Sequence, residues 1–75
     1  MKIKAFGYLA EILHGHCIAI DNVKDIESLR KYLSENYPEI IKTEYKIAID
    51  HELVKANIPI NNESEVVLLP PFAGG

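Results

Sequence analysis

This chain of 75 residues has little cysteine and little excess charge, and both shortages narrow its possible roles. Cys17 is the single cysteine, so no disulfide can close within the chain, which fits a reducing compartment. The net charge is -3, and acidic and basic residues are interspersed, so no basic stripe is available to follow a nucleic-acid backbone. We therefore expect no nucleic-acid partner.

Long hydrophobic runs are also missing. The longest, Val66–Ala73, falls well short of the roughly 20 residues that cross a bilayer, and the first residues alternate charged with apolar side chains instead of building a signal peptide. These patterns predict a cytoplasmic protein with no membrane partner. A chain this short forms one domain and buries only about 60% of the surface that its unfolded form exposes.

The usual constellations for catalysis or metal binding are absent as well. The chain has no glycine-rich phosphate loop, no paired-carboxylate site and no Ser-His arrangement, so we expect it to bind no cofactor and to supply no catalytic side chain. His14, His16 and Cys17 are possible zinc ligands, but His16 and Cys17 would point to opposite faces of a strand, and elsewhere only His51 could add a ligand. An iron-sulfur cluster needs about four cysteines. We predict no metal site.

Hydrophobic alternation marks two strands in the first part of the chain. Met1–Gly7 places Ile3 and Ala5 on one side, with Phe6 as an exception among the lysines of the other side. A second strand is expected at His16–Asp21. The two strands should pair as a hairpin, with a bend at Gly15.

Two helical segments follow from the spacing of apolar residues. Tyr8–Leu13 is long enough for one packed turn only. Asp25 is the expected N-cap of the main helix, which ends at Pro38. Its apolar residues recur at spacings of three, four and four, which predicts one buried stripe: Ile26, Leu29, Leu33 and Tyr37.

In the second half of the chain, the sequence predicts three more strands. After a loop through Lys42, Tyr45–Asp50 alternates as a strand, and a tight turn leads into a short strand around Leu53 and Val54. Pro59 restricts the next piece to an edge or a loop, with Ile60 filling the core. In the turn 61–64, Asn62 is the residue expected in a left-handed conformation.

The final strand, Glu65–Leu69, is apolar on both faces, as expected for a central strand. One face should meet the helix, and the other should present Val67 and Leu69 beside Phe6, an exposed apolar patch typical of a protein-binding surface. Pro70 and Pro71 then stop sheet pairing, so the chain should leave the body as an extended arm ending in two glycines.

The element order β-β-α-β-β-β, together with the ending Leu69-Pro70-Pro71-Phe72-Ala73-Gly74-Gly75, resembles the MoaD/ThiS family of ubiquitin-like β-grasp sulfur carriers, which includes the small subunit of molybdopterin synthase. The resemblance implies an α+β fold in which one β-grasp domain spans residues 1–75 and the tail, residues 70–75, is flexible. Two positions depart from the family pattern: Glu63 stands where a glycine is common, and Phe72 is bulkier than usual.

The resemblance also implies a function. An E1-like adenylating enzyme would use ATP to activate the carboxylate of Gly75, and a sulfur donor protein would convert it to a thiocarboxylate. The large subunit of a heterotetrameric molybdopterin synthase would then pass that sulfur to cyclic pyranopterin monophosphate. Gly74 would let the tail thread into the active site of the partner, and the residues expected to contact partners are Phe6, Val67, Leu69, Pro70, Pro71, Phe72 and Ala73.

Two other functions stay open at this point. The chain could be a sulfur carrier for the thiamine pathway or for another thiolation, which differs only in its activating enzyme and acceptor. It could also be a ubiquitin-like interaction module that binds through its sheet and whose terminus takes part in no chemistry. Whether the chain counts as an enzyme depends on the complex that it joins.

Overall fold

The secondary structure alternates short strands with two α-helices and one 3-10 helix. In the computed structural model, which describes residues 1–71, the elements are β1 (Lys2–Ala5), α1 (Tyr8–Leu13), β2 (Cys17–Ala19), α2 (Ile26–Asn36), η1 (Pro38–Lys42), β3 (Lys46–Ile49), β4 (Glu52–Leu53) and β5 (Val66–Leu69). The predicted strands and helices are confirmed, with shorter strands than expected. The 3-10 helix η1 occupies part of the expected loop.

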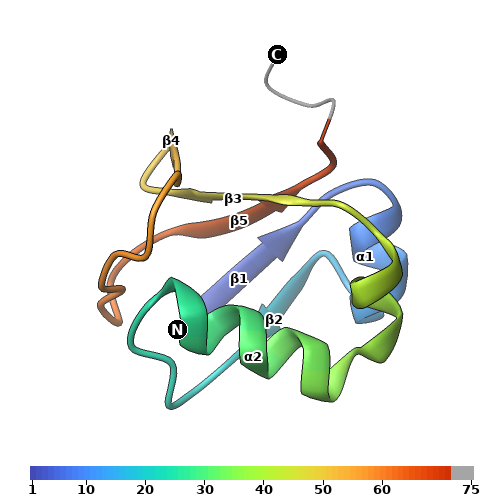
Figure 1. Cartoon of the computed structure of the whole chain (residues 1–75), viewed down its shortest axis with the longest axis horizontal. Coiled ribbons are helices and arrows are strands. Elements are labelled where there is room, and N and C mark those ends of the chain that lie inside the picture. Colours follow the sequence, from blue (N-terminus) through green and yellow to red (C-terminus); the bar gives the residue numbers. More distant parts are fainter. Residues whose placement is uncertain (72–75) are drawn as a thin grey trace.

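The strands form one mixed sheet in the order β2-β1-β5-β3-β4. β1 and β5 are parallel, and the other neighbours are antiparallel. β5 therefore lies in the middle of the sheet, as its two apolar faces predicted, and β1 and β2 pair as the predicted hairpin, with α1 in the connection. Figure 1 shows α2 lying across one face of the sheet. We call the opposite side the outer face.

The core fills the space between the sheet and α2. Ile3 and Ala5 of β1 are buried, as the alternation predicted, and Val66 and Leu68 of β5 have no exposed surface. Three residues of the predicted stripe on α2 are buried: Ile26, Leu29 and Leu33. The fourth, Tyr37, is partly buried and packs against the core. Ile60 is buried, as expected.

Asp25 begins α2 as predicted, and Ser28 completes a capping box that the sequence reading had not identified. The Ser28 N–H donates to Asp25 Oδ1 at 2.8 Å, and the Asp25 N–H donates to Ser28 Oγ at 3.1 Å. Both bonds satisfy donors that the first turn of a helix leaves free. The hydrogen bond from the Ser28 backbone, followed by that from its hydroxyl, lowers the pKa of the Asp25 carboxyl below its ordinary value.

The left-handed residues are not where the sequence suggested. Asn62 does not have a positive φ, so that prediction was wrong. The turn is instead held by Asn61, whose Oδ1 accepts from the Glu63 N–H at 2.9 Å and whose carbonyl accepts from the Ser64 N–H at 3.1 Å. The asparagine side chain thus stabilises the turn from its first position, where no left-handed backbone is needed.

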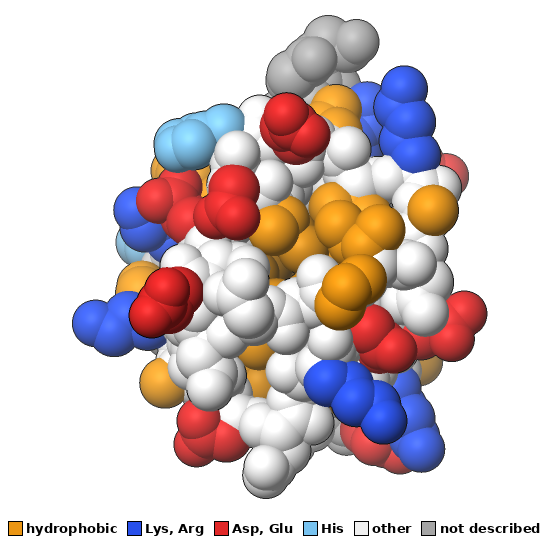
Figure 2. All heavy atoms as spheres, turned by 90° about the vertical axis from the view of Figure 1, so that its left-hand side faces the viewer, with side chains coloured by type: hydrophobic (Ala, Val, Ile, Leu, Met, Phe, Trp, Pro, Cys, Tyr) orange, Lys and Arg blue, Asp and Glu red, His pale blue; other side chains and the backbone are white. Residues whose placement is uncertain are grey.

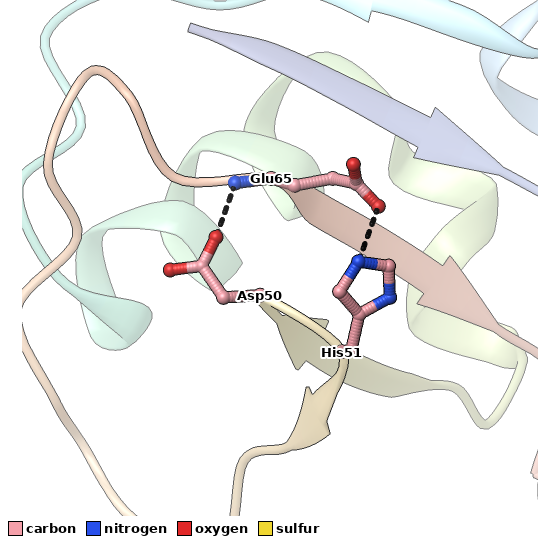
Figure 3. A network of polar contacts seen from close by, with 3 residues as sticks. All are labelled: Asp50, His51 and Glu65. Carbon is pink, nitrogen blue, oxygen red and sulfur yellow. Dashed lines mark hydrogen bonds and ion pairs between the residues drawn. The ribbon is translucent and has the colours of Figure 1, made fainter.

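The tight turn between β3 and β4 does use left-handed backbone. Asp50 and His51 have φ values of 51° and 73°, the combination found in two-residue hairpin loops of type I′. Figure 3 shows that Asp50 also reaches the start of β5, where its Oδ1 accepts from the Glu65 N–H at 2.9 Å. This bond joins the β3–β4 turn to the central strand.

A candidate docking face and the base of the tail

Side chains from three neighbouring strands form a row on the outer face. In the sheet register Val67 of β5 lies opposite Ala48 of β3, and Ala48 in turn lies opposite Leu53 of β4. Paired residues share a face of the sheet, so these three side chains lie side by side. On the far side of Val67, β1 contributes Lys4. The apolar row therefore has a cationic end.

The outer face has a hollow along this row. Its volume is about 410 Å³, and it is lined by Ala48, His51, Leu53, Val67 and Leu69. Val67 and Leu69 are half-buried, whereas Leu53 is 39% exposed. We call this feature the outer-face hollow. Its apolar floor and accessible walls suit an apolar side chain supplied by a partner.

The sequence had singled out Val67 and Leu69 but not the other lining residues. The sequence predicts Ala48 and Leu53 only as members of their strands, because the register that brings β3 and β4 beside β5 depends on pairing between distant segments. The alternation of Ala48 with Ile47 and Ile49 was the one signal that could have placed Ala48 on the outer face.

One polar contact between side chains lies at the rim of the hollow. Figure 3 shows the His51 ring beside the Glu65 side chain, with 3.9 Å between Nε2 and Oε1. The His51 side chain is 84% exposed and the Glu65 side chain 43% exposed, so water and salt screen this contact and it adds little to stability. Its role is to occupy the edge of the hollow with polar groups.

Phe6 lies just beyond β1 and is 49% exposed. Its N–H donates to the carbonyl oxygen of Leu68 at 3.3 Å, which continues the pairing of β1 with β5 by one residue. Continuing the same register puts Phe6 opposite Leu69, next to the last residue of the central strand. The structure therefore brings together the three predicted docking residues of the sheet, and their contact with a partner stays a prediction.

The residues after β5 begin the tail. Pro70 is buried and Pro71 is half-buried, so the first proline of the tail packs against the domain itself. An ideal Cβ added to Gly7 would lie 3.1 Å from Pro70 Cγ. The predicted tail residues Phe72, Ala73, Gly74 and Gly75 lie outside the described residues, and their roles stay predictions.

The possible metal ligands do not gather in the part of the chain that the structure describes. Among residues 1–71, no three His, Cys, Asp or Glu side chains lie close enough together to hold a metal ion. His16 and Cys17 are both exposed on β2 and its approach. Within the same residues, neither α1 nor α2 is long and apolar enough to cross a membrane.

A second apolar area lies on another side of the molecule. Figure 2 shows hydrophobic side chains near the middle of this side, surrounded by charged side chains of both signs. Two further hollows, of about 330 and 190 Å³, lie beside α2; both are lined by Arg30, Val54 and Lys55, and the smaller one also by Tyr45, Lys46 and Ile47. Arg30 lies over the ring of Tyr45, with 5.1 Å to the ring centroid. The mixed charges around this area favour no particular class of partner.

Comparison with known proteins gives concordant results from sequence and from structure. The model of the ThiS family matches residues 3–75. A molybdopterin synthase sulfur carrier subunit from Caenorhabditis elegans is 30% identical over 81 aligned positions, covering 100% of this chain and 96% of the relative.

Two solved structures share the fold. The crystal structure of SAMP1 from Haloferax volcanii has a TM-score of 0.72 and 17% identity, covering 99% of this chain and 97% of that one. The solution structure of small archaeal modifier protein 1 from Methanosarcina acetivorans has a TM-score of 0.76 and 20% identity, covering 99% and 94%. These neighbours confirm the predicted ubiquitin-like β-grasp fold.

Proposed function

The chain belongs to the ThiS family, and on that premise we propose that it is a sulfur carrier that serves as the small subunit of molybdopterin synthase. The observation that carries the proposal is the similarity, along the full length of both chains, to a molybdopterin synthase sulfur carrier subunit. The tail sequence supports it, because two prolines followed by Gly74-Gly75 combine a stiff base with an end that lacks side chains.

The first step of the proposed chemistry activates the Gly75 carboxylate. One carboxylate oxygen attacks the α-phosphorus of ATP in the active site of an E1-like enzyme, and pyrophosphate leaves, which gives an acyl-adenylate. A sulfur donor protein then delivers sulfur at the oxidation level of hydrosulfide to the carbonyl carbon. The new C–S bond replaces the C–O bond, AMP leaves, and Gly75 carries a thiocarboxylate.

The second step transfers the sulfur within the synthase. In the large subunit, the thiocarboxylate sulfur would form a bond to a carbon of cyclic pyranopterin monophosphate while a C–O bond of that carbon breaks, and the displaced oxygen leaves as water or stays on the phosphate. Water then cleaves the resulting thioester, which leaves sulfur on the pterin and restores the carboxylate of Gly75. Two tails would supply the two sulfurs of the dithiolene, which fits a heterotetramer with two small subunits. All catalytic side chains and the ATP site belong to the partners in this scheme.

The geometry of the domain suits such a carrier. The outer-face hollow and Phe6 surround the end of β5, so a partner that docks there is next to the point where the tail begins. Fully extended, the segment from Pro70 to Gly75 spans roughly 20 Å at about 3.3 Å per residue. A docked partner can therefore hold an active site at that distance from the sheet. A cytoplasmic location is part of the proposal, because the proposed activation step consumes ATP.

The thiamine pathway remains the second candidate, because the matching family model is that of ThiS. It shares the activation chemistry and differs in the acceptor. The two candidates are separated by offering the loaded protein either the large synthase subunit with cyclic pyranopterin monophosphate or the thiazole-forming enzymes, and by observing which acceptor removes the sulfur.

The decisive experiment is intact mass spectrometry of the purified chain. The starting mass first establishes that Gly75 carries a free carboxylate. Incubation with an E1-like adenylating enzyme, ATP and a sulfur donor should then add the mass of one oxygen-to-sulfur exchange, and fragmentation should place it on Gly75. Omission of ATP and deletion of Gly75 are the controls. If no exchange occurs while an established carrier is loaded in the same assay, the interaction-module hypothesis replaces this proposal.

A further inference from the structure

Gly7 has a backbone conformation that only glycine adopts readily. Its φ of 61° and ψ of -141° lie outside the regions open to residues with a Cβ. The residue sits at the junction between β1 and α1, where its carbonyl accepts from the Ala10 N–H at 3.1 Å and begins the helix. The preceding residue is fixed as well, because the Phe6 N–H bonds to Leu68 and the Phe6 carbonyl accepts from the Leu9 N–H at 3.2 Å.

The missing side chain of Gly7 leaves the space that Pro70 occupies. A Cβ on Gly7 would lie 3.1 Å from Pro70 Cγ, which is closer than ordinary carbon contacts. The proline cannot simply move aside, because its ring is closed onto its own backbone and it follows directly after β5. Pro70 is buried at this point, so the contact holds the first residue of the tail.

We propose that Gly7 is a positioning residue for sulfur loading. Because Gly7 has no side chain, the Pro70 ring can pack against its backbone, and this contact sets the point and the direction in which the tail leaves the sheet. The inference rests on the proposed carrier function and adds to it a residue far from the tail in sequence. The position of the carboxylate at the end of a short tail depends on the direction in which the first residue of the tail points. Small displacements of reacting groups reduce reaction rates by large factors.

The test compares two variants, each of which replaces one glycine by alanine. Gly7→Ala introduces a Cβ where Pro70 and the positive φ both oppose it. Gly15→Ala is the matched control, since Gly15 does not have a positive φ and the nearest atom to its Cβ would be the Cys17 carbonyl oxygen at 3.9 Å. We expect Gly7→Ala to slow loading by the E1-like enzyme at least about tenfold, and Gly15→Ala to load within about twofold of the wild type.

A second readout separates positioning from loss of the fold. Each unloaded variant is used as a competitor against loading of the wild type, and its inhibition constant measures docking alone. A folded Gly7→Ala protein should compete within about threefold of the wild type while being a poor substrate itself, so the defect should lie mainly in kcat. A general loss of structure would weaken competition and loading together, and that result would overturn the inference.

A double-mutant cycle tests the contact itself. Pro70→Ala removes the Cγ atom that a Cβ at position 7 would meet, so the combined variant should load no more slowly than Gly7→Ala alone. If the rate loss of the double variant equals the product of the losses in the two single variants, the residues act independently and the inference is overturned. A Gly7→Ala protein that loads at the wild-type rate would overturn it too, whereas a wild-type chain that cannot be loaded would refute the carrier function.

Discussion

Ala48 of β3 and Val67 of β5 face each other across the antiparallel ladder, on the side of the sheet away from α2. This pairing joins the tail-bearing strand to the edge of the sheet that carries Leu53, and it creates the outer-face hollow. A change in one of these side chains therefore alters the proposed docking site on the outer face without reaching into the core beneath.

The docking face can be tested with a charge at its centre. Val67→Asp should weaken binding to the large synthase subunit by at least about tenfold, because a docked partner would bury an unpaired carboxylate. Titration calorimetry measures the loss. Ile41→Asp is the control, since Ile41 is 68% exposed in η1, away from the sheet, and should leave affinity unchanged. Equal affinities for both variants would rule out the outer face as the docking site.

The tail can be tested without disturbing the domain. Gly74→Phe adds a large side chain next to the carboxylate of Gly75 and should reduce sulfur loading by about a hundredfold or more, because in the proposed function the end of the tail enters the active site of a partner. Loading is followed by intact mass, and thermal unfolding checks that the midpoint is unchanged. Normal loading of this variant would show that the adenylating enzyme does not enclose the last two residues.

The β3–β4 turn offers a stabilising substitution. His51 has a φ of 73°, which costs a residue with a Cβ about 1 kcal/mol, so His51→Gly should raise the free energy of unfolding by roughly 0.5–1 kcal/mol. Urea denaturation measures the change. Asp50→Gly relieves a similar φ but also removes the hydrogen bond from Glu65 to Asp50, so it should gain less. A loss of stability in His51→Gly would contradict this account of the turn.

The capping box predicts a dependence on pH. Hydrogen bonding from Ser28 lowers the pKa of Asp25 below its ordinary value of 3.8, so the folded chain takes up this proton at lower pH than the unfolded chain. The stabilisation is complete above the ordinary pKa and is lost as the pH falls through the lowered pKa of the folded state. Asp25→Asn retains a capping oxygen but cannot titrate. Its stability should therefore fall less steeply in acid, and parallel pH profiles would contradict the prediction.

Much of the fold was predictable because its signals are local. Asp25 precedes a stripe of apolar residues at helical spacing, and the two apolar faces of Val66–Leu69 can only be buried in the middle of a sheet. Asn62 was assigned wrongly because the preceding Asn61 holds the turn through its side chain. The 3-10 helix η1 differs from the predicted loop because Pro38 ends α2 and also begins the next helical segment, which buries Ile40.

The site was predictable only where it depends on a single strand. Val67 and Leu69 follow from alternation along β5, whereas Ala48 and Leu53 join them through pairing between segments well separated in the sequence. The contact between Gly7 and Pro70 joins residues near opposite ends of the chain, and hydrophobic periodicity in the sequence does not predict such a contact. These neighbours depend on which distant segments pair and in which register, and the pattern along a single strand does not show that.

The central place of β5 has a consequence for protein synthesis. This strand is made after every other element described, yet it pairs with β1, the first, and with β3. A nascent chain therefore cannot complete the sheet, and an unfolded copy presents neither the outer-face hollow nor the seat for Pro70. If the proposed activating enzyme binds both features, it would spend ATP and sulfur only on finished, folded molecules, and the topology would then act as quality control over which chains are loaded.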